Sequence, residues 1–427
     1  MTFLEHPRRM PRRRPVAERV QDFDEVYAPF AEEDARQQAG RCMDCGVPFC
    51  QAGCPLGNVI PDWNALAHDG DWHAAYRRLR ATNNFPEFTG RLCPAPCESA
   101  CVLGIIDGPV TIEHIEQAIA DRAWAEGWVQ PTPPAHRTGR RVAVVGSGPA
   151  GLACADQLNH AGHAVTVFER DDRAGGLLRY GIPDFKIDRA VLDRRLAVME
   201  AEGVVFRTGT EVGTDVSVGA LRAYDAVVLC AGAPRPRALD LPGRALGGIY
   251  IAMDYLVRQN RRCAGDAVPE RPDARGRHVL VIGGGDTASD CIGTAHRQGA
   301  ASVTNFHLWP APPPERPADQ PWPFHPHVFC VSTSHEEGCE RVWAVQTLAF
   351  EGRGGRVRAV RTIDVAPGPP GPDGRRQAVP IPGTERRWAA DLVLVAVGFA
   401  GAERSLPERL GAALTPRGTV ATDAGYR

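Results

Sequence analysis

Short segments with the pattern of strands come in two pairs in the later two thirds of the chain, and three of the four are mostly apolar while the last is mixed. The first pair covers residues 141–145 and 164–168, and the second covers residues 278–282 and 302–307. Runs of about five apolar residues bounded by turn residues are typical of strands that are buried on both faces of a parallel sheet. Between the members of each pair, a stretch with the residue types of a helix follows a glycine-rich turn. The pattern therefore predicts two strand–helix–strand units of an α/β protein.

The first third of the chain has a helical pattern instead. Residues 62–80 carry apolar side chains at helical spacing, and residues 109–117 resemble the start of a helix with Thr111 as its cap. Residues 131–139 are rich in proline and end in glycine, which marks a linker. We expect a small helical domain before this linker.

Seven of the 13 cysteines lie in this helical part. They are Cys42, Cys45, Cys50, Cys54, Cys93, Cys97 and Cys101. A disulfide framework would need an oxidising compartment, and zinc is the stronger rival because C-x2-C pairs suit a tetrahedral site. The first four follow the spacing C-x2-C-x4-C-x3-C with a proline after the last, which resembles ferredoxin-type iron–sulfur binding. Seven thiolates are one short of two four-ligand clusters, so an eighth ligand comes from another residue type or one site is incomplete. Glu113, Glu116 and Gln117 are nearby donors, although by themselves they look like solvated helix residues.

The first glycine turn has the sequence Gly146-Ser147-Gly148-Pro149-Ala150-Gly151. It follows a strand and opens a helix, and the next strand ends in Glu169, which is the full context of the dinucleotide fingerprint. Its glycines let the backbone approach a pyrophosphate at the helix N-terminus, and the acid accepts a hydrogen bond from a ribose hydroxyl. The residues predict a dinucleotide site here.

The second turn, Gly283-Gly284-Gly285-Asp286-Thr287-Ala288, repeats the pattern with alanine for the third glycine. The acid expected after the second strand is absent, and His307 stands near its place. The choice between NADH and NADPH therefore stays open: a partly cationic His307 would help a 2′-phosphate, and a solvated loop histidine is the other interpretation. Two dinucleotide folds pair most usefully as a flavin and a nicotinamide, with iron–sulfur centres as one-electron carriers.

Composition places the chain among globular proteins and gives it no overall charge preference. It has 427 residues, 43% of them hydrophobic, and a formal net charge of -2, so it shows no general attraction to nucleic acid or membrane. The basic run at residues 8–14 lacks both a following apolar segment and interleaved aromatic residues, which favours a solvated arm or a docking strip. No apolar run approaches the ~20 residues that cross a bilayer. We expect a cytoplasmic protein that binds neither nucleic acid nor membrane.

Four longer strings resemble a known family. They are RCMDCG at 41–46, ATNNFPEFTGRLCP at 81–94, GGLLRYGIPDFK at 175–186 and SHEEG at 334–338. The chain resembles the small (β) subunit of glutamate synthase over essentially its whole length, and also the N-terminal half of dihydropyrimidine dehydrogenase. The resemblance implies an α/β protein in which a helical iron–sulfur domain (1–130) precedes two Rossmann-like domains, for FAD (139–240) and for NAD(P) (241–404). Residues 405–427 would begin the return to an FAD domain that is truncated at its C-terminus in this sequence.

The same resemblance implies the site residues. One [4Fe-4S] cluster would be held by Cys42, Cys45, Cys50 and Cys101. The other would be held by Cys54, Cys93 and Cys97 with Glu116 as the fourth ligand, and Gln117 as the fallback. FAD would contact Gly146, Gly148, Pro149, Ala150, Gly151, Glu169, Gly175, Gly176, Leu177 and Lys186. NADPH or NADH would contact Gly283, Gly284, Gly285, Asp286 and Thr287, with His307 near its ribose and Gly398 where the chain leaves the domain.

Three other features have plainer interpretations. His335-Glu336-Glu337 fits no metal-binding spacing and predicts a surface turn. The proline-rich residues 310–323 predict a stiff loop. The six remaining cysteines are expected to be buried small hydrophobes.

The function that the resemblance implies is the electron-input subunit of glutamate synthase. Such a subunit oxidises NAD(P)H via FAD and passes electrons through [4Fe-4S] clusters to a large (α) subunit, which makes L-glutamate from L-glutamine and 2-oxoglutarate. The chemistry lies in the cofactors, so no catalytic side chain is expected. Two alternatives are a stand-alone NAD(P)H-dependent flavin and iron–sulfur reductase for another acceptor, and a cluster-bearing structural partner that lacks FAD.

Overall fold

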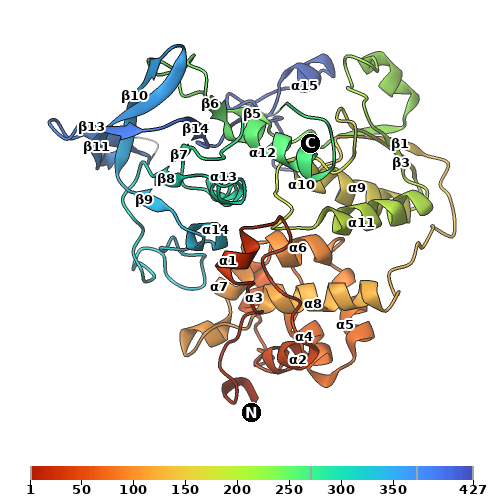
Figure 1. Cartoon of the computed structure of the whole chain (residues 1–427). Coiled ribbons are helices and arrows are strands. Elements are labelled where there is room, and N and C mark those ends of the chain that lie inside the picture. Colours follow the sequence, from red (N-terminus) through yellow and green to blue (C-terminus); the bar gives the residue numbers. More distant parts are fainter. Residues whose placement is uncertain (1, 270–271, 372–373, 426–427) are drawn as a thin grey trace.

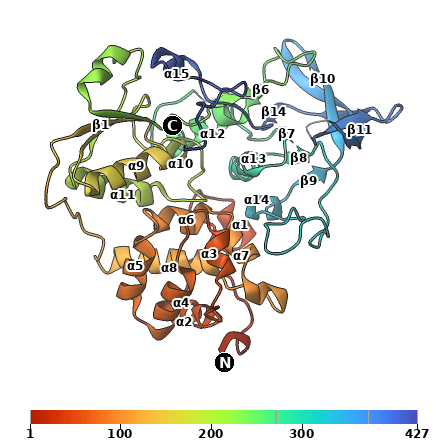
Figure 2. The same ribbon diagram turned by 180° about the vertical axis from the view of Figure 1, so that it is seen from behind.

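The computed structural model describes residues 2–269, 272–371 and 374–425. Of the predicted C-terminal segment 405–427, residues 426 and 427 lie outside the described residues. We name its parts the cysteine unit (η1 to α8), the first α/β unit (β1 to β4) and the second α/β unit (β6 to β14). Figure 1 shows the cysteine unit, in red and orange, below the two α/β units. Figure 2 shows from behind that both α/β units lie above the cysteine unit.

The cysteine unit is built of short helices around an apolar core. Its elements are η1 (Thr2–Leu4), α1 (Val16–Arg19), α2 (Glu32–Ala39), α3 (Phe49–Gly53), α4 (Ile60–Asp69), α5 (Trp72–Arg80), α6 (Pro86–Leu92), α7 (Pro96–Ser99), η2 (Val102–Ile105) and α8 (Ile112–Ala125). Trp63, Leu79, Ile115 and Ile119 are fully buried in its core. The core fixes the helices that carry the seven cysteines.

The helical spacing at residues 62–80 is confirmed, and the structure divides the stretch into two helices. Gly70 ends α4 at a φ of 84°, and Asp71 caps α5 by accepting a hydrogen bond from the Ala74 N–H at 3.0 Å. The expected cap of α8 is wrong. Thr111 stands at the N-terminus of α8 without capping it, since its hydroxyl donates to the Arg9 carbonyl at 3.2 Å.

The basic run is not a solvated arm. Four of its arginines form ion pairs within the protein, with the partners Arg8–Glu98, Arg9–Asp34, Arg13–Glu336 and Arg14–Asp22. Their carboxylates come from α7, α2, α14 and the segment after α1, so the run ties the start of the chain to three parts of the fold. This pairing depends on residues far away in the sequence.

The first α/β unit contains the predicted strand–helix–strand pattern. Its elements are β1 (Arg141–Val145), α9 (Pro149–His160), β2 (Ala164–Phe168), α10 (Leu177–Tyr180), α11 (Arg189–Ala201), β3 (Val205–Arg207), η3 (Val218–Ala223) and β4 (Ala226–Leu229), after which comes β5 (Arg235–Pro236). The sheet is parallel with the order β3-β2-β1-β4, and its central strand β1 is buried from Val142 to Val145. Both neighbours of β1 end at the edge where the first glycine turn lies, which is where a dinucleotide binds in such sheets.

The second α/β unit repeats the arrangement and adds an antiparallel sheet. Its elements are β6 (Ile249–Ile251), α12 (Ala252–Cys263), β7 (His278–Ile282), α13 (Asp286–Arg297), β8 (Ser302–Phe306), α14 (Thr333–Glu336), β9 (Glu340–Val342), β10 (Val345–Arg353), β11 (Arg356–Pro370), β12 (Arg376–Pro380), β13 (Arg386–Ala389) and β14 (Leu392–Val395). The parallel sheet has the order β6-β14-β7-β8-β9, and β10 to β13 pair antiparallel beside it. After Gly398, β15 (Phe399–Gly401) pairs with β5, and α15 (Ser405–Arg409) follows.

Buried ion pairs join the units. Arg195 on α11 bonds to Glu87 on α6 at 2.6 Å, and both side chains are almost completely buried. Glu337 accepts hydrogen bonds from Arg19 on α1 and from Arg297 on α13. The expected surface turn at 335–337 is therefore wrong, because Glu337 lies in a buried network at the end of α14. No helix in the described ranges combines the length and the apolar character needed to cross a membrane.

Candidate functional site

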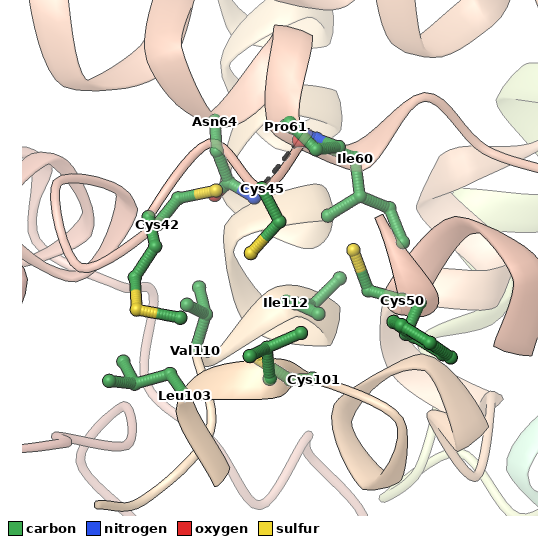
Figure 3. Close-up of a pocket in the computed structure, with 13 residues that line it drawn as sticks. Cys42, Cys45, Cys50, Ile60, Pro61, Asn64, Cys101, Leu103, Val110 and Ile112 are labelled. Atoms are coloured by element: carbon green, nitrogen blue, oxygen red, sulfur yellow. Dashed lines mark hydrogen bonds between the residues drawn. The ribbon is translucent and has the colours of Figure 1, made fainter. Parts of the chain in front are cut away.

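Four of the cysteines surround one cavity in the cysteine unit. Cys42 and Cys45 follow α2, Cys50 lies in α3, and Cys101 precedes η2. Figure 3 shows the four around one pocket, whose other walls are formed largely by apolar side chains such as Ile60, Leu103 and Ile112. Burial raises the pKa of Cys42 to about 11 and that of Cys50 to about 12, so these thiols are protonated until a cation takes the proton's place.

The other three cysteines form a second group at the ends of three helices. Cys54 ends α3, Cys93 ends α6 and Cys97 lies in α7. Burial raises the pKa of Cys97, and the charges of Glu98, Glu116, Cys54 and Cys93 raise it further. Helix α3, which Cys54 ends, packs directly against α7, which carries Cys97. Between Cys93 and Cys97, Ala95 has a φ of 49° and directs its N–H to the Cys93 sulfur at 3.4 Å. A left-handed alanine is costly, and such backbone conformations cluster at functional sites.

Glu116 on α8 lies with this second group. It is buried, and burial raises its pKa to about 7. Its Oε1 accepts hydrogen bonds from Asn83, at 3.1 Å, and from the Thr89 hydroxyl. Over the described ranges no group bonds to Oε2, which leaves that oxygen available as a ligand.

Gln117 faces another way. Its amide contacts His114 at 3.4 Å and Asp121 at 3.5 Å, and its backbone lies against α6, where a Cβ added to Gly90 would come within 2.7 Å. The structure therefore brings Glu116, and not Gln117, to the second cysteine group. Asn83 and Thr89 were not predicted as site residues, although they lie in the string at 81–94.

The two donor sets suit iron–sulfur clusters. Soft thiolates in apolar surroundings are the ligands that such clusters take. The first group offers four thiols, and the second offers three thiols with the Glu116 carboxylate nearby. The division into two groups agrees with the one that the resemblance implies.

The first glycine turn forms a tight cradle between β1 and α9. Gly146 has a φ of 102°, and a Cβ added to it would lie 2.4 Å from the Cys230 carbonyl oxygen on the neighbouring strand end. A Cβ added to Gly148 would meet nothing within 4 Å, so the turn is open on the side where a pyrophosphate would approach the start of α9.

Glu169 is fixed beside this turn. Its Oε2 accepts hydrogen bonds from the backbone N–H, at 3.0 Å, and the hydroxyl of Ser147, and its Oε1 accepts one from the Asp171 N–H at 2.9 Å. The carboxylate is buried at the end of β2, where a ribose would lie. Among the expected neighbours, Gly175 donates its N–H to the Ser147 hydroxyl at 2.9 Å, and Gly176 precedes α10.

Lys186 lies between the two α/β units. Its ammonium donates to the Thr333 hydroxyl at 3.1 Å, and its charge lowers the pKa of Asp290 on α13. Burial is the larger influence and raises the pKa of Asp290 to about 7. Asp290 was not predicted, although it stands three residues after Thr287 on the same helix.

The second glycine turn abuts His307. A Cβ added to Gly284 would lie 2.4 Å from His307 Nδ1, so only glycine leaves room there. His307 is buried and stacks on Trp343 with ring centroids 3.7 Å apart. Burial, together with the charges of Arg341 and His335, lowers its pKa to about 4. Both interpretations offered for His307 are therefore wrong, since it is neither partly cationic at neutral pH nor a solvated loop residue.

The remaining expected positions lie at the same edge. Gly283 and Gly285 flank Gly284, and Asp286 and Thr287 open α13. Gly398 follows β14 with a φ of 85°. The six remaining cysteines are less buried than expected, since only Cys291 is fully buried and Cys330 is exposed.

Two known protein families match successive parts of the chain. The family described as dihydropyrimidine dehydrogenase domain II, 4Fe-4S cluster, matches residues 19–128. The family described as pyridine nucleotide-disulphide oxidoreductase matches residues 140–321. FprA of Mycobacterium tuberculosis, solved in complex with NADPH, shares the fold with a TM-score of 0.50 at 20% identity, over 67% of this chain and 76% of that one.

Bacterial glutamate synthase small chains match this chain over nearly its whole length. The glutamate synthase [NADPH] small chain of Mycobacterium tuberculosis is 55% identical over 98% of this chain and 86% of its own length, and that of Bacillus subtilis is 45% identical over 96% and 87%. Glutamate synthase [NADH] of Saccharomyces cerevisiae is 46% identical over 99% of this chain, which corresponds to 20% of the yeast protein. With these identities over nearly its whole length, the chain belongs to the glutamate synthase small-chain family.

Proposed function

We propose that this chain is the electron-input subunit of a glutamate synthase. It oxidises NADPH or NADH and supplies the electrons to a large (α) subunit, where L-glutamate is made from L-glutamine and 2-oxoglutarate. The observation that carries the proposal is the presence, in one chain of this family, of two groups of cluster-type ligands beside two dinucleotide cradles. When bound, FAD accepts a hydride and iron–sulfur centres carry single electrons.

We assign the cluster ligands as two sets. Cys42, Cys45, Cys50 and Cys101 hold one [4Fe-4S] cluster, and Cys54, Cys93, Cys97 and Glu116 hold the other. The hydrogen bonds from Asn83 and Thr89 hold Oε1 of Glu116, so Oε2 would be the oxygen that binds a cluster iron. This assignment makes residues 1–130 the iron–sulfur domain, and the thiols need the reducing conditions of the cytoplasm.

We assign the dinucleotide residues by the same geometry. The turn from Gly146 to Gly151 and the start of α9 bind the FAD pyrophosphate, and Glu169 holds the ribose, within a domain that begins at residue 139 and extends to 240. Gly175 to Leu177 and Lys186 complete its lining. The turn at 283–287 binds the nicotinamide nucleotide in the domain formed by residues 241–404. Residues 405–427 follow as the return towards the FAD domain.

A coupled assay tests the proposal. The chain is produced anaerobically together with a glutamate synthase large subunit, and NAD(P)H oxidation and glutamate formation are both measured. We expect Cys45→Ser to abolish glutamate formation while reduction of an artificial dye continues, and Cys330→Ser, at an exposed cysteine outside both groups, to leave both unchanged. Glutamate formation that survives Cys45→Ser would contradict the proposed electron path.

The same experiment separates the alternatives. A protein that reduces dyes but never supports glutamate formation with a large subunit is a stand-alone reductase. A protein that retains no FAD after reconstitution is a cluster-bearing structural partner.

A further inference from the structure

The second glycine turn does not reveal whether this chain prefers NADPH or NADH. The acid that would hold an unphosphorylated ribose is replaced by His307, and the relatives described above are named for either NADPH or NADH. Because His307 is neutral, it supplies no charge to a phosphate. The group that discriminates between the two nucleotides must therefore be sought among its neighbours.

Arg341 is a cation in direct contact with His307. It lies on β9, whose register pairs it with Asn305 on β8, so its side chain starts at the strand edge that carries His307. Its Nε lies 3.5 Å from His307 Nε2, and the opposite ring nitrogen, Nδ1, faces Gly284 of the glycine turn. The three residues thus form a continuous row from the turn to the guanidinium.

The guanidinium is held in place but not neutralised. It stacks on Trp343 and Phe329, at 4.5 Å and 5.0 Å from the ring centroids, and one terminal nitrogen donates to the Cys330 carbonyl at 2.9 Å. In the part of the chain that the structure describes, no carboxylate pairs with Arg341, and its second terminal nitrogen, Nη2, makes no hydrogen bond. The residue is partly exposed, so an anion can reach it.

We propose that Arg341 binds the 2′-phosphate of NADPH and makes this chain prefer NADPH over NADH, an inference that rests on the nicotinamide site proposed above. An arginine stacked on aromatic rings is pre-organised, and its planar fork matches a phosphate group. His307 acts as a positioning residue, because its Nε2 accepts from Arg341 while its stacking on Trp343 fixes the ring. The sequence gives no sign of this pairing, since 34 residues separate His307 from Arg341.

Binding of two small probes tests the assignment without turnover. Isothermal titration of the full chain with its cofactors compares adenosine 2′,5′-bisphosphate with 5′-AMP, which differ only in the 2′-phosphate. We expect the wild type to bind the bisphosphate more tightly, and Arg341→Gln to weaken the bisphosphate about ten- to a hundredfold, as expected for hydrogen bonds to a charged group, with 5′-AMP unchanged. Arg341→Lys keeps the charge without the fork and should lose part of the preference.

Arg386→Gln is the matched control. Arg386 also lies over a tryptophan, Trp388, at 5.2 Å, and belongs to the antiparallel sheet of the same unit. It should bind both probes as the wild type does.

Any other result would contradict the assignment of Arg341 to the 2′-phosphate. An Arg341→Gln variant that keeps its preference, or loses both probes equally, overturns the role of Arg341. A wild type that binds both probes equally overturns it too, while leaving the proposed function with NADH as donor. A wild type that binds neither probe refutes the proposed nicotinamide site itself, and the inference fails with it.

Discussion

Glu337 should be the side chain on which the docking of the second α/β unit depends most. It accepts three hydrogen bonds, from Arg19 Nε at 2.8 Å and from two nitrogens of Arg297 at 2.6 Å and 3.0 Å. The side chains of all three residues are at most 2% exposed. Glu337→Ala leaves the buried Arg297 without its carboxylate and leaves the buried Arg19 with only the longer contact to Glu336, at 3.3 Å.

Breaking a buried ion pair by removing one partner costs about 3–5 kcal/mol. At about 1.4 kcal/mol for each factor of ten, amide hydrogen exchange in α13 should become faster by about two to three and a half powers of ten, where exchange requires this network to open. Mass spectrometry measures the exchange rate in the peptides that cover α13. The protein does not have to be unfolded and refolded for this measurement.

Glu336→Ala is the control, because it removes the adjacent carboxylate. The side chain of Glu336 is 31% exposed and pairs with the partly exposed Arg13, and its contact with the buried Arg19, at 3.3 Å, is longer than that of Glu337. Its removal should cost no more than about 1 kcal/mol. Equal effects of the two substitutions, or no change in α13 with Glu337→Ala, would refute the reasoning.

Three further predictions follow from the site. Glu116→Ala should lower the iron content by about four atoms per chain, the equivalent of one cluster, whereas Gln117→Ala should leave the iron content unchanged. Iron analysis of anaerobically purified protein measures both. Equal losses of iron in the two variants would contradict the choice of Glu116 as the ligand. Glu169→Gln should weaken FAD binding about tenfold or more, because an amide has only one acceptor oxygen and its NH2 group would face either the Ser147 donors or the Asp171 N–H. Flavin titration measures this, with the exposed Glu200→Gln as control. Burial lowers the folded-state pKa of His335 to about 4, so the unfolded chain takes up the proton first, near pH 6.5, and stability falls as the pH drops from about 7 towards 4. Urea midpoints at pH 7.5 and pH 5 should differ less in His335→Gln, and an unchanged difference would count against His335 as a source of the effect.

Features set by local sequence were predictable. The four strands of the two strand–helix–strand units and both glycine turns follow from apolar runs and backbone requirements within about thirty residues, and the structure contains them. The grouping of the cysteines was available only through the resemblance, because loop spacing does not reveal which thiols of two sequence-separated groups meet in space.

Features set by long-range packing were not predictable. The arginines at 8–14 looked like a free basic run because their carboxylate partners lie as far away as Glu336. His307 looked like a solvated or cationic residue because its burial comes from Trp343, on a segment beyond a long proline-rich loop. The break at Gly70 is a different case, since a glycine followed by a capping aspartate was visible in the sequence and predicts the end of one helix and the start of another.

The most direct test of the central claim is metal and sulfide analysis of anaerobically purified protein, combined with low-temperature EPR after reduction. The account predicts about eight iron atoms and eight acid-labile sulfides per chain, and the signal of reduced [4Fe-4S] centres. A colourless protein, or one that carries zinc at the seven cysteines, would contradict it.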